Sequence, residues 1–235
     1  MNFKKYIPNL ITLLNLFCGC IAVVYVFQQD FEMAFLFVCL GIFLDFFDGF
    51  FARLFKVSSP LGLQLDSLAD MVTSGFVPGT IMFFMLKSSS GMSETNLIPF
   101  LGFIITLGSC FRLANFNIDE RQTDSFIGLP TPANALFILS LPLILKYSDS
   151  IITLELLTNH AFLLVITLLS AFILNAEIPL FSLKIKKLNF VNNKIQIFFL
   201  LFSVLLIVFF QYLGIALSIV FYVLLSVLIN KFQKK

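Results

Sequence analysis

Apolar runs, each close to the length of one membrane crossing, recur along the whole chain and are separated by short polar breaks. The runs lie near residues 8–27, 33–55, 62–86, 97–117, 131–146, 160–180, 194–212 and 214–230. About twenty predominantly apolar residues in a helix cross the hydrocarbon core of a bilayer, where an open sheet would leave backbone groups unpaired. The pattern therefore predicts an all-α integral membrane protein with about eight transmembrane helices.

The composition supports a lipid environment. Hydrophobic residues make up 59% of the 235 residues and charged residues 12%, and 32 phenylalanines occur without any tryptophan. A soluble domain carries about 25% charged residues. We find no internal repeat or low-complexity linker, and we therefore expect one membrane-embedded domain over residues 1–235.

Lysine and arginine are distributed unevenly between the two membrane faces. With an even number of spans both termini share one face, and that face holds thirteen of the 15 basic residues. These are Lys4, Lys5, Arg53, Lys56, Arg112, Arg121, Lys184, Lys186, Lys187, Lys194, Lys231, Lys234 and Lys235. Only Lys87 and Lys146 fall on the opposite face. Because positive charge near helix ends stays in the cytoplasm, we expect an inner-membrane protein with both termini on the cytoplasmic side.

Two other interpretations, nucleic-acid binding and a cleaved signal peptide, are not supported by the sequence. The net charge of +2 reflects topology signals and contacts with anionic lipid head groups, and it gives no indication of nucleic acid. The N-terminal MNFKKY resembles the start of a signal peptide, but the run at 8–27 is long and has no small-residue cleavage site. We therefore expect a retained helix there.

Four aspartates interrupt the second and third apolar runs. Asp45 and Asp48 are three residues apart in one run, and Asp66 and Asp70 are four residues apart in the next, so each pair lies on one face of its helix. A turn of about eight residues, which includes Ser58, Ser59 and Pro60, separates the runs. The sequence therefore predicts two antiparallel helices whose acidic stripes face each other near the cytoplasmic surface.

Four facing carboxylates in a membrane need a counter-charge. Each costs roughly 2.5 to 3.5 kcal/mol to insert, and together they repel one another. Divalent cations bind carboxylate oxygens at about 2.0 to 2.6 Å and would relieve both effects. The alternative is that these residues are helix-end acids that pair with Arg53 or Lys56.

A divalent-cation transporter is an alternative of another class, since carboxylates also line cation paths. It would explain the acids. It would not explain the arginine beside them, which repels cations, or the apolar outer halves of the spans, such as VPGTIMFFML.

Small residues beside the aspartates suggest what the site binds. Gly49 and Gly62 remove side chains where the two helices face each other, and Ala52 keeps that face clear. The guanidinium of Arg53 suits phosphate oxygens. Metal-binding carboxylates, cleared space and an arginine together indicate a site for a phosphate-linked nucleotide or lipid.

The stretch D-x-x-D-G-x-x-A-R, eight further residues and G-x-x-x-D-x-x-x-D resembles the signature of the CDP-alcohol phosphatidyltransferases, with every position filled. The resemblance implies a six-helix catalytic core at about 8–180 with two extra helices at about 194–230. It implies two divalent ions held by the four aspartates, for which Mg²⁺, Mn²⁺ and Ca²⁺ are all suited. It also implies that Asp70 acts as general base, and that cytidine of CDP-diacylglycerol lies by the two glycines. Asn9, Thr12 and Ser59, near the cytoplasmic entrance, are assigned to the same CDP-lipid site.

Other motifs bear on the acceptor alcohol. I-P-N-L-I-T-L-L-N, F-R-L-A-N-F-N and G-L-P-T-P look like the phosphatidylserine synthases of this family, which implies L-serine as acceptor. Arg112 could pair with the serine carboxylate and Asn115 could hydrogen-bond to it. The alternatives are an interfacial arginine with helix-end amides, and a sister activity with glycerol 3-phosphate or inositol. In the family, a basic residue is frequent at the position of Asn115.

Dimerisation is common in this family. Gly75 and Gly79 are one helical turn apart and could form a helix contact, but with Pro78 between them they could equally mark a kink. The sequence leaves both alternatives open, and a homodimer is an expectation from the resemblance.

Overall fold

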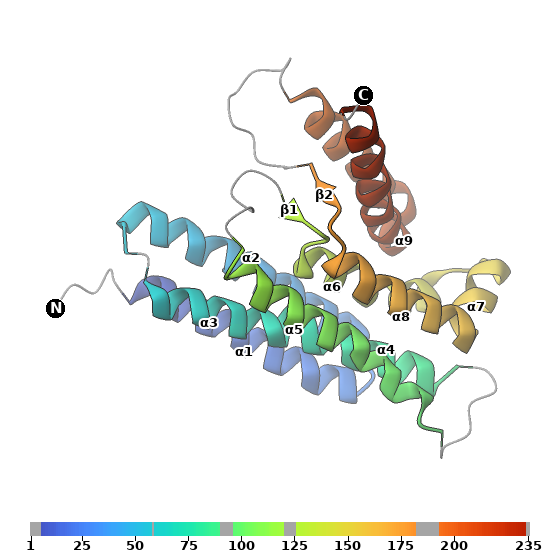
Figure 1. Ribbon diagram of the computed structural model, residues 1–235. Coiled ribbons are helices and arrows are strands. Elements are labelled where there is room, and N and C mark those ends of the chain that lie inside the picture. Colours follow the sequence, from blue (N-terminus) through green and yellow to red (C-terminus); the bar gives the residue numbers. More distant parts are fainter. Residues whose placement is uncertain (1–5, 58, 90–95, 120–125, 182–192, 234–235) are drawn as a thin grey trace.

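The computed structural model describes residues 6–57, 59–89, 96–119, 126–181 and 193–233, and almost all of them are helical (Figure 1). The helices are α1 (Ile7–Phe27), α2 (Phe31–Phe55), α3 (Pro60–Asp70), the π-helix η2 (Met71–Phe76), α4 (Val77–Lys87), the 3₁₀-helix η3 (Ile98–Phe103), α5 (Ile104–Phe116), α6 (Thr131–Tyr147), α7 (Ile151–Thr158), α8 (His160–Asn175) and α9 (Lys194–Gln233). The strands are β1 (Phe126–Ile127) and β2 (Pro179–Leu180). Ser58 and the basic residues Lys4, Lys5, Arg121, Lys184, Lys186, Lys187, Lys234 and Lys235 lie outside the described residues.

The predicted all-α membrane class is confirmed. Five continuous helical segments are long and apolar enough to cross a bilayer: Ile7–Phe27, Phe31–Phe55, Pro60–Lys87, Ile98–Phe116 and Lys194–Lys231. Two shorter apolar helices, Thr131–Tyr147 and His160–Asn175, complete the pattern expected from the apolar runs. The short helix α7 lies in the segment between the apolar runs at 131–146 and 160–180. Its eight residues are too few to span a bilayer.

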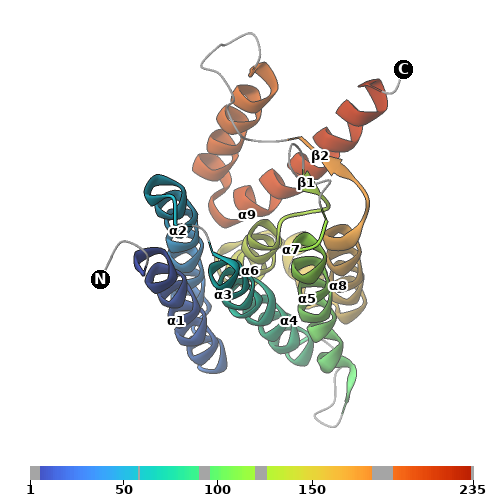
Figure 2. The same cartoon turned by 60° about the vertical axis from the view of Figure 1, so that its left-hand side comes forward.

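The core of the bundle lies between α1, α2, α4, α6 and α8. Its fully buried residues include Ala22, Val26, Ala34, Val38, Ile81, Met82, Leu86, Ile138, Leu139 and Leu163. α1 and α2 run antiparallel and are joined by a short turn, in which the Asp30 side chain accepts a hydrogen bond from Met33 N at 3.1 Å and caps α2. Figure 2 shows α1 and α2 as one pair, with α3 and α4 next to them and with α5 and α8 on the other side of α3 and α4.

Two small departures from a purely helical chain occur around α8. The predicted run at 160–180 stops being helical at Asn175, and Pro179 and Leu180 form an antiparallel pair with Ile127 and Phe126. Proline has no backbone N–H and restricts the residue before it, so it favours extended backbone after the helix. This two-stranded connection fixes the start of α6 against the end of α8.

The last two predicted spans are the two arms of α9. The helix bends at Gln211, whose backbone is non-helical at φ 50° and ψ −121°, close to the break between the apolar runs at 194–212 and 214–230. Gly214 allows a close approach, because a Cβ there would lie 2.1 Å from Leu206 O. The arms, residues 194–210 and 212–233, pack through ring pairs such as Phe202–Phe221, and they form a V in Figure 2.

The α9 arms extend between the two ends of the bundle. At the bend, the ring of Tyr212 contacts those of Phe35 near the start of α2 and Tyr147 at the end of α6. Towards the other end, Tyr222 Oη donates to Phe181 O at 2.9 Å, just after β2. We call the end where α2 finishes the cleft end, and the end where α2 begins the far end.

Gly75 and Gly79 lie against α5 of the same chain. A Cβ on Gly75 would meet Ser109 at 3.1 Å, and one on Gly79 would meet Thr106 at 2.0 Å. Thr106 Oγ1 also donates to Gly75 O at 3.0 Å. The two glycines therefore serve an intramolecular helix contact, and Gly75 lies within the π-helix that follows Asp70.

Candidate active site

The turn between α2 and α3 brings the two acidic stripes together. Lys56 ends α2 in the left-handed region at φ 55°, and its backbone N–H bonds back to the last turn of the helix. Ser59 then caps α3, because its Oγ accepts from Gly62 N at 3.1 Å, and Pro60 occupies the first turn, where a missing N–H is harmless. This tight connection returns the chain from α2 to α3 at the cleft end, and both helices pack on α1.

Three of the four predicted metal ligands meet. Asp45 and Asp48 of α2 and Asp66 of α3 each place a carboxylate oxygen so that all three oxygens lie within 4.8 Å of one another. Asp48 is buried, and the other two are half-buried. Asp70 is buried deeper along α3 and lies outside this group of three. The predicted convergence of the acidic stripes is confirmed for the three residues.

Polar side chains of α1 hold the carboxylates. Thr12 Oγ1 donates to Asp48 Oδ2 at 2.5 Å. Asn15 Nδ2 lies 3.3 Å from Asp70 Oδ1 and 3.4 Å from Asp45 Oδ1, and donates to both. The sequence analysis assigned Thr12 to the CDP-lipid site and missed Asn15. One feature of the sequence does indicate Asn15: an amide three residues after Thr12 lies on the same face of a membrane helix, where buried polar groups need partners.

A cleft of about 180 Å³ opens beside the three carboxylates. It is lined by Pro8, Asn9, Thr12, Asp48, Gly49, Ala52, Val57, Ser59, Gly62, Leu63 and Asp66. A Cβ on Gly49 would meet nothing nearer than Arg53 Nη1 at 3.5 Å, whereas one on Gly62 would lie 3.2 Å from Asn9 Oδ1. The structure thus brings together six residues that the sequence analysis assigned to the CDP-lipid site, with Arg53 exposed beside Gly49.

Arg112 and Asn115 belong to a different cleft, of about 80 Å³, that shares no residue with the aspartate cleft. Arg112 is buried, and its Nη1 donates to Ile127 O at 2.8 Å and to Leu174 O at 2.9 Å. These bonds join β1 to the end of α8. Asn117, two residues beyond Asn115, docks α5 on α3 because its Nδ2 donates to Ser67 Oγ at 2.9 Å.

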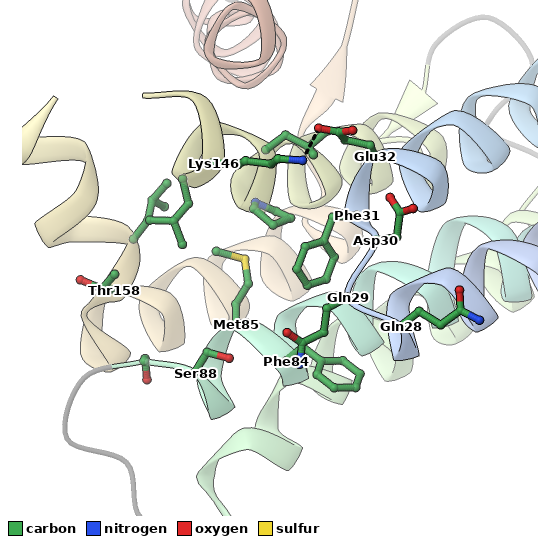
Figure 3. A pocket seen from close by; sticks show the side chains of 15 residues that line it. Gln28, Gln29, Asp30, Phe31, Glu32, Phe84, Met85, Ser88, Lys146 and Thr158 are labelled. Atoms are coloured by element: carbon green, nitrogen blue, oxygen red, sulfur yellow. Dashed lines mark hydrogen bonds and ion pairs between the residues drawn. The ribbon is translucent and has the colours of Figure 1, made fainter. Parts of the chain in front are cut away.

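A larger cavity, of about 530 Å³, lies at the far end between the turn that joins α1 to α2, the start of α2, the ends of α4 and α6, and α7 (Figure 3). Three charged side chains line it: Asp30, Glu32 and Lys146. Lys146 Nζ lies 2.6 Å from Glu32 Oε1, to which Tyr147 Oη also donates, and Asp30 caps α2. Glu32 and Lys146 pair with each other and Asp30 caps α2, so among the described residues that line this cavity there is no carboxylate cluster like that of the aspartate cleft.

Comparison with known proteins agrees with this geometry. The family model of the CDP-alcohol phosphatidyltransferases matches residues 5–164, and the chain belongs to this family. The matched region contains the whole aspartate cleft. It ends within α8, before α9 and before Leu174, Asn175 and Glu177, which line part of the Arg112 cleft.

Three curated relatives that resemble this chain are each named CDP-diacylglycerol--serine O-phosphatidyltransferase. The Bacillus subtilis protein is 36% identical over 132 residues, which are 54% of this chain and 70% of that protein. The Helicobacter pylori J99 protein is 37% identical over 136 residues, covering 56% of this chain and 54% of the relative. The Saccharomyces cerevisiae protein is 34% identical over 152 residues, covering 58% and 53%. The chain therefore spans about half the length of the last two relatives.

Proposed function

We propose that this protein transfers the phosphatidyl group of CDP-diacylglycerol to the hydroxyl of L-serine, giving phosphatidylserine and CMP. The observation that carries the proposal is the cleft at the α2–α3 turn, where three carboxylates converge beside the space left by Gly49 and Gly62. The names of the relatives support serine as the acceptor.

The donor set fits a hard divalent cation. Asp45, Asp48 and Asp66 offer oxygen ligands only, close together and partly shielded from solvent, which suits Mg²⁺, Mn²⁺ or Ca²⁺. The family resemblance makes two ions the expected number. A metal bound there would neutralise the diphosphate and stabilise the negative charge on departing CMP.

The residues of the chain then supply binding and proton transfer. The serine oxygen attacks the phosphorus that carries diacylglycerol, a new P–O bond forms, and the P–O bond to CMP breaks. Asp70 accepts the proton of the serine hydroxyl as general base. The open face of Gly49 and Ala52 accommodates the nucleotide, and Arg53 at its rim binds a phosphate oxygen.

Arg112 and Asn115 are proposed to contact the acceptor. Their cleft is polar and small, as a serine-sized molecule requires. Arg112 Nη1 already bonds two backbone carbonyls, so the remaining guanidinium nitrogens would face serine. Replacing Arg112 by Lys, which keeps the charge but loses the planar fork, should raise the KM for serine by about tenfold or more.

The cation-transporter alternative has less support. Between the aspartate cleft and the far end, most buried side chains of α1, α2 and α4 are apolar, as at Ala22, Val38 and Ile81, and the hydroxyl of the buried Thr80 donates to Phe76 O in the preceding turn. A conduction path needs polar groups across the bilayer. Uptake of Mn²⁺ by reconstituted vesicles in the absence of CDP-diacylglycerol would support transport instead.

The test of the proposed reaction is turnover by the purified protein in mixed micelles. With labelled L-serine, labelled phosphatidylserine should form only when both CDP-diacylglycerol and Mg²⁺ or Mn²⁺ are present, and EDTA should abolish it. Glycerol 3-phosphate and inositol serve as competing acceptors. Product with either of these and none with serine would assign a sister activity.

A further inference from the structure

Asn15 connects the two acidic helices from a third helix. Its side chain is fully buried in α1. Its single amide nitrogen contacts Asp45 of α2 and Asp70 of α3. One neutral donor therefore touches a carboxylate from each acidic helix.

Packing around Asn15 fixes its position. Its backbone carbonyl accepts a hydrogen bond from Thr73 Oγ1 at 3.2 Å, and Thr73 lies in the π-helix η2 directly after Asp70. Two glycines make room for this contact. A Cβ on Gly41 would lie 2.8 Å from Asn15 Oδ1, and a Cβ on Gly19 would lie 2.6 Å from Thr73 Oγ1.

The other atom of the amide indicates why an asparagine is present. Asn15 Oδ1 is buried, and no partner for it occurs among the residues that the structure describes. An unpaired buried acceptor costs about 1 to 3 kcal/mol, which an apolar side chain of similar size would avoid. The amide is therefore explained by its contacts with the two carboxylates and not by helix packing.

The chemistry of an amide suits this place. Its N–H groups remain donors at every working pH, and they add no charge to a site that already holds four carboxyl groups. Each of its two bonds goes to an Oδ1 atom, so neither bond involves the Oδ2 atom of Asp45 or of Asp70. The bonds also oppose the electrostatic repulsion that would push the two side chains apart.

We propose that Asn15 is a positioning residue of the active site: its amide holds the general base Asp70 in the orientation that accepts the proton, and ties it to Asp45 of the metal-ligand group. This inference rests on the proposed function for the role of Asp70, while the link to the metal ligands is independent of turnover.

The test compares Asn15→Leu with a matched control. Leucine keeps the size of the side chain and removes both contacts. The control is Asn134→Leu, since Asn134 is also a buried amide in a membrane helix, but it bonds Ser170 of α8 away from the aspartate cleft. Turnover with labelled serine, the unfolding temperature in detergent and Mn²⁺ binding by electron paramagnetic resonance are measured for both.

Asn15→Leu should lower kcat by about 10- to 100-fold, because hydrogen bonds to charged groups carry an effect of this size. The KM values for CDP-diacylglycerol and serine should stay within about threefold. The dissociation constant of Mn²⁺ should rise by about tenfold, as is usual when a group that orients a metal ligand is lost. In Asn134→Leu, kcat, the two KM values and the dissociation constant of Mn²⁺ should all stay unchanged.

A kcat of Asn15→Leu within about twofold of the natural protein, or an equal loss of kcat in Asn134→Leu, would overturn the proposal. If Asn15→Leu does not fold, Asn15→Ser makes the same comparison, since its short side chain cannot reach both carboxylates. If the natural protein makes no phosphatidylserine, the proposed function fails, and Mn²⁺ binding alone then decides the role of Asn15. An unchanged Mn²⁺ affinity in the variant would refute it.

Discussion

Asp70 differs from the other three aspartates in its surroundings. Asp45, Asp48 and Asp66 bring carboxylate oxygens within 4.8 Å of one another, whereas Asp70 is buried and lies outside this group. A general base needs a free oxygen near the substrate hydroxyl, and a ligand needs an oxygen directed at the metal. The geometry therefore favours different roles for residues of one type.

Replacing Asp70 by Asn tests this division of roles. The shape is conserved and the proton acceptor is lost, so we expect turnover to fall by at least about 100-fold. Binding of CDP-diacylglycerol and of Mn²⁺ should change little. Asp66→Asn is the control, for which Mn²⁺ binding should be lost together with turnover. An active Asp70→Asn protein would refute the general-base assignment.

Gly49 and Gly41 have different reasons to be glycine, although both lie in α2. A Cβ on Gly49 would enter the cleft without a close contact, whereas a Cβ on Gly41 would lie 2.8 Å from both Asn15 Oδ1 and Thr73 Cγ2. The first glycine leaves space for a ligand. The second allows α1, α2 and η2 to approach.

The Gly49→Ala variant should therefore fold normally and bind the nucleotide poorly. Alanine is favoured over glycine within a helix by about 0.5 to 1 kcal/mol, so the unfolding temperature should hold or rise. The KM for CDP-diacylglycerol should rise by about tenfold, as a methyl group fills space in the cleft. Steady-state turnover measures the KM for CDP-diacylglycerol, and thermal unfolding in detergent measures the unfolding temperature. An unchanged KM would show that the nucleotide lies elsewhere.

At the scale of elements, the crossing of α4 and η3 depends on one glycine. A Cβ on Gly102 would lie 2.6 Å from Phe83 N and 2.9 Å from the carbonyl carbon of Met82, which are backbone atoms that cannot rotate away. The rings of Phe83, Phe100 and Phe103 pack around this crossing. The segment is far from the aspartate cleft and contributes to stability.

We expect Gly102→Ala to destabilise the protein by about 1 to 3 kcal/mol, because the two helices must separate to admit the methyl group. The remaining folded protein should keep its KM values. Thermal unfolding in detergent and steady-state kinetics at low temperature provide the measurements, with Gly49→Ala as the variant that shows the opposite pattern. Unchanged stability would mean that the helices do not cross this closely.

At the scale of the whole molecule, the polar groups are divided between the two ends of the bundle. The cleft end carries the aspartates, Arg53 and Lys56, and the far end carries Lys87 and the Glu32–Lys146 pair. Thirteen of the 15 basic residues in the sequence are assigned to the face that carries Arg53 and Lys56. Because cytoplasmic ends are richer in Lys and Arg, the cleft end is proposed to face the cytoplasm. The soluble substrate serine would then enter from that side.

Cysteine labelling of intact cells tests this orientation. In a background with Cys18, Cys20, Cys39 and Cys110 replaced by Ala, single cysteines are placed at the exposed positions Lys56 and Ser88. A membrane-impermeant maleimide should label Ser88→Cys in intact cells and Lys56→Cys only after the membrane is opened. The reverse pattern would invert the proposed orientation.

Local spacing explains why much of the site could be predicted. A helix places side chains three and four residues apart on one face, so the aspartate pairs and their meeting across a short turn follow from neighbours in sequence. The same holds for the membrane spans, which depend on the apolar length of each run. The contacts of Asn15 could not be predicted from local spacing, since its partners Asp45 and Asp70 are 30 and 55 residues away.

The sequence alone determined that this chain is a membrane protein of helices and that Asp45, Asp48 and Asp66 meet beside Gly49 and Gly62, because these features depend on helix period and on the length of a bilayer crossing. Only the tertiary structure decided which groups hold the aspartates, where α9 bends, and that Arg112 Nη1 joins β1 to α8. These features depend on contacts between helices that are distant in sequence. Such contacts are set by packing, and no local pattern encodes them.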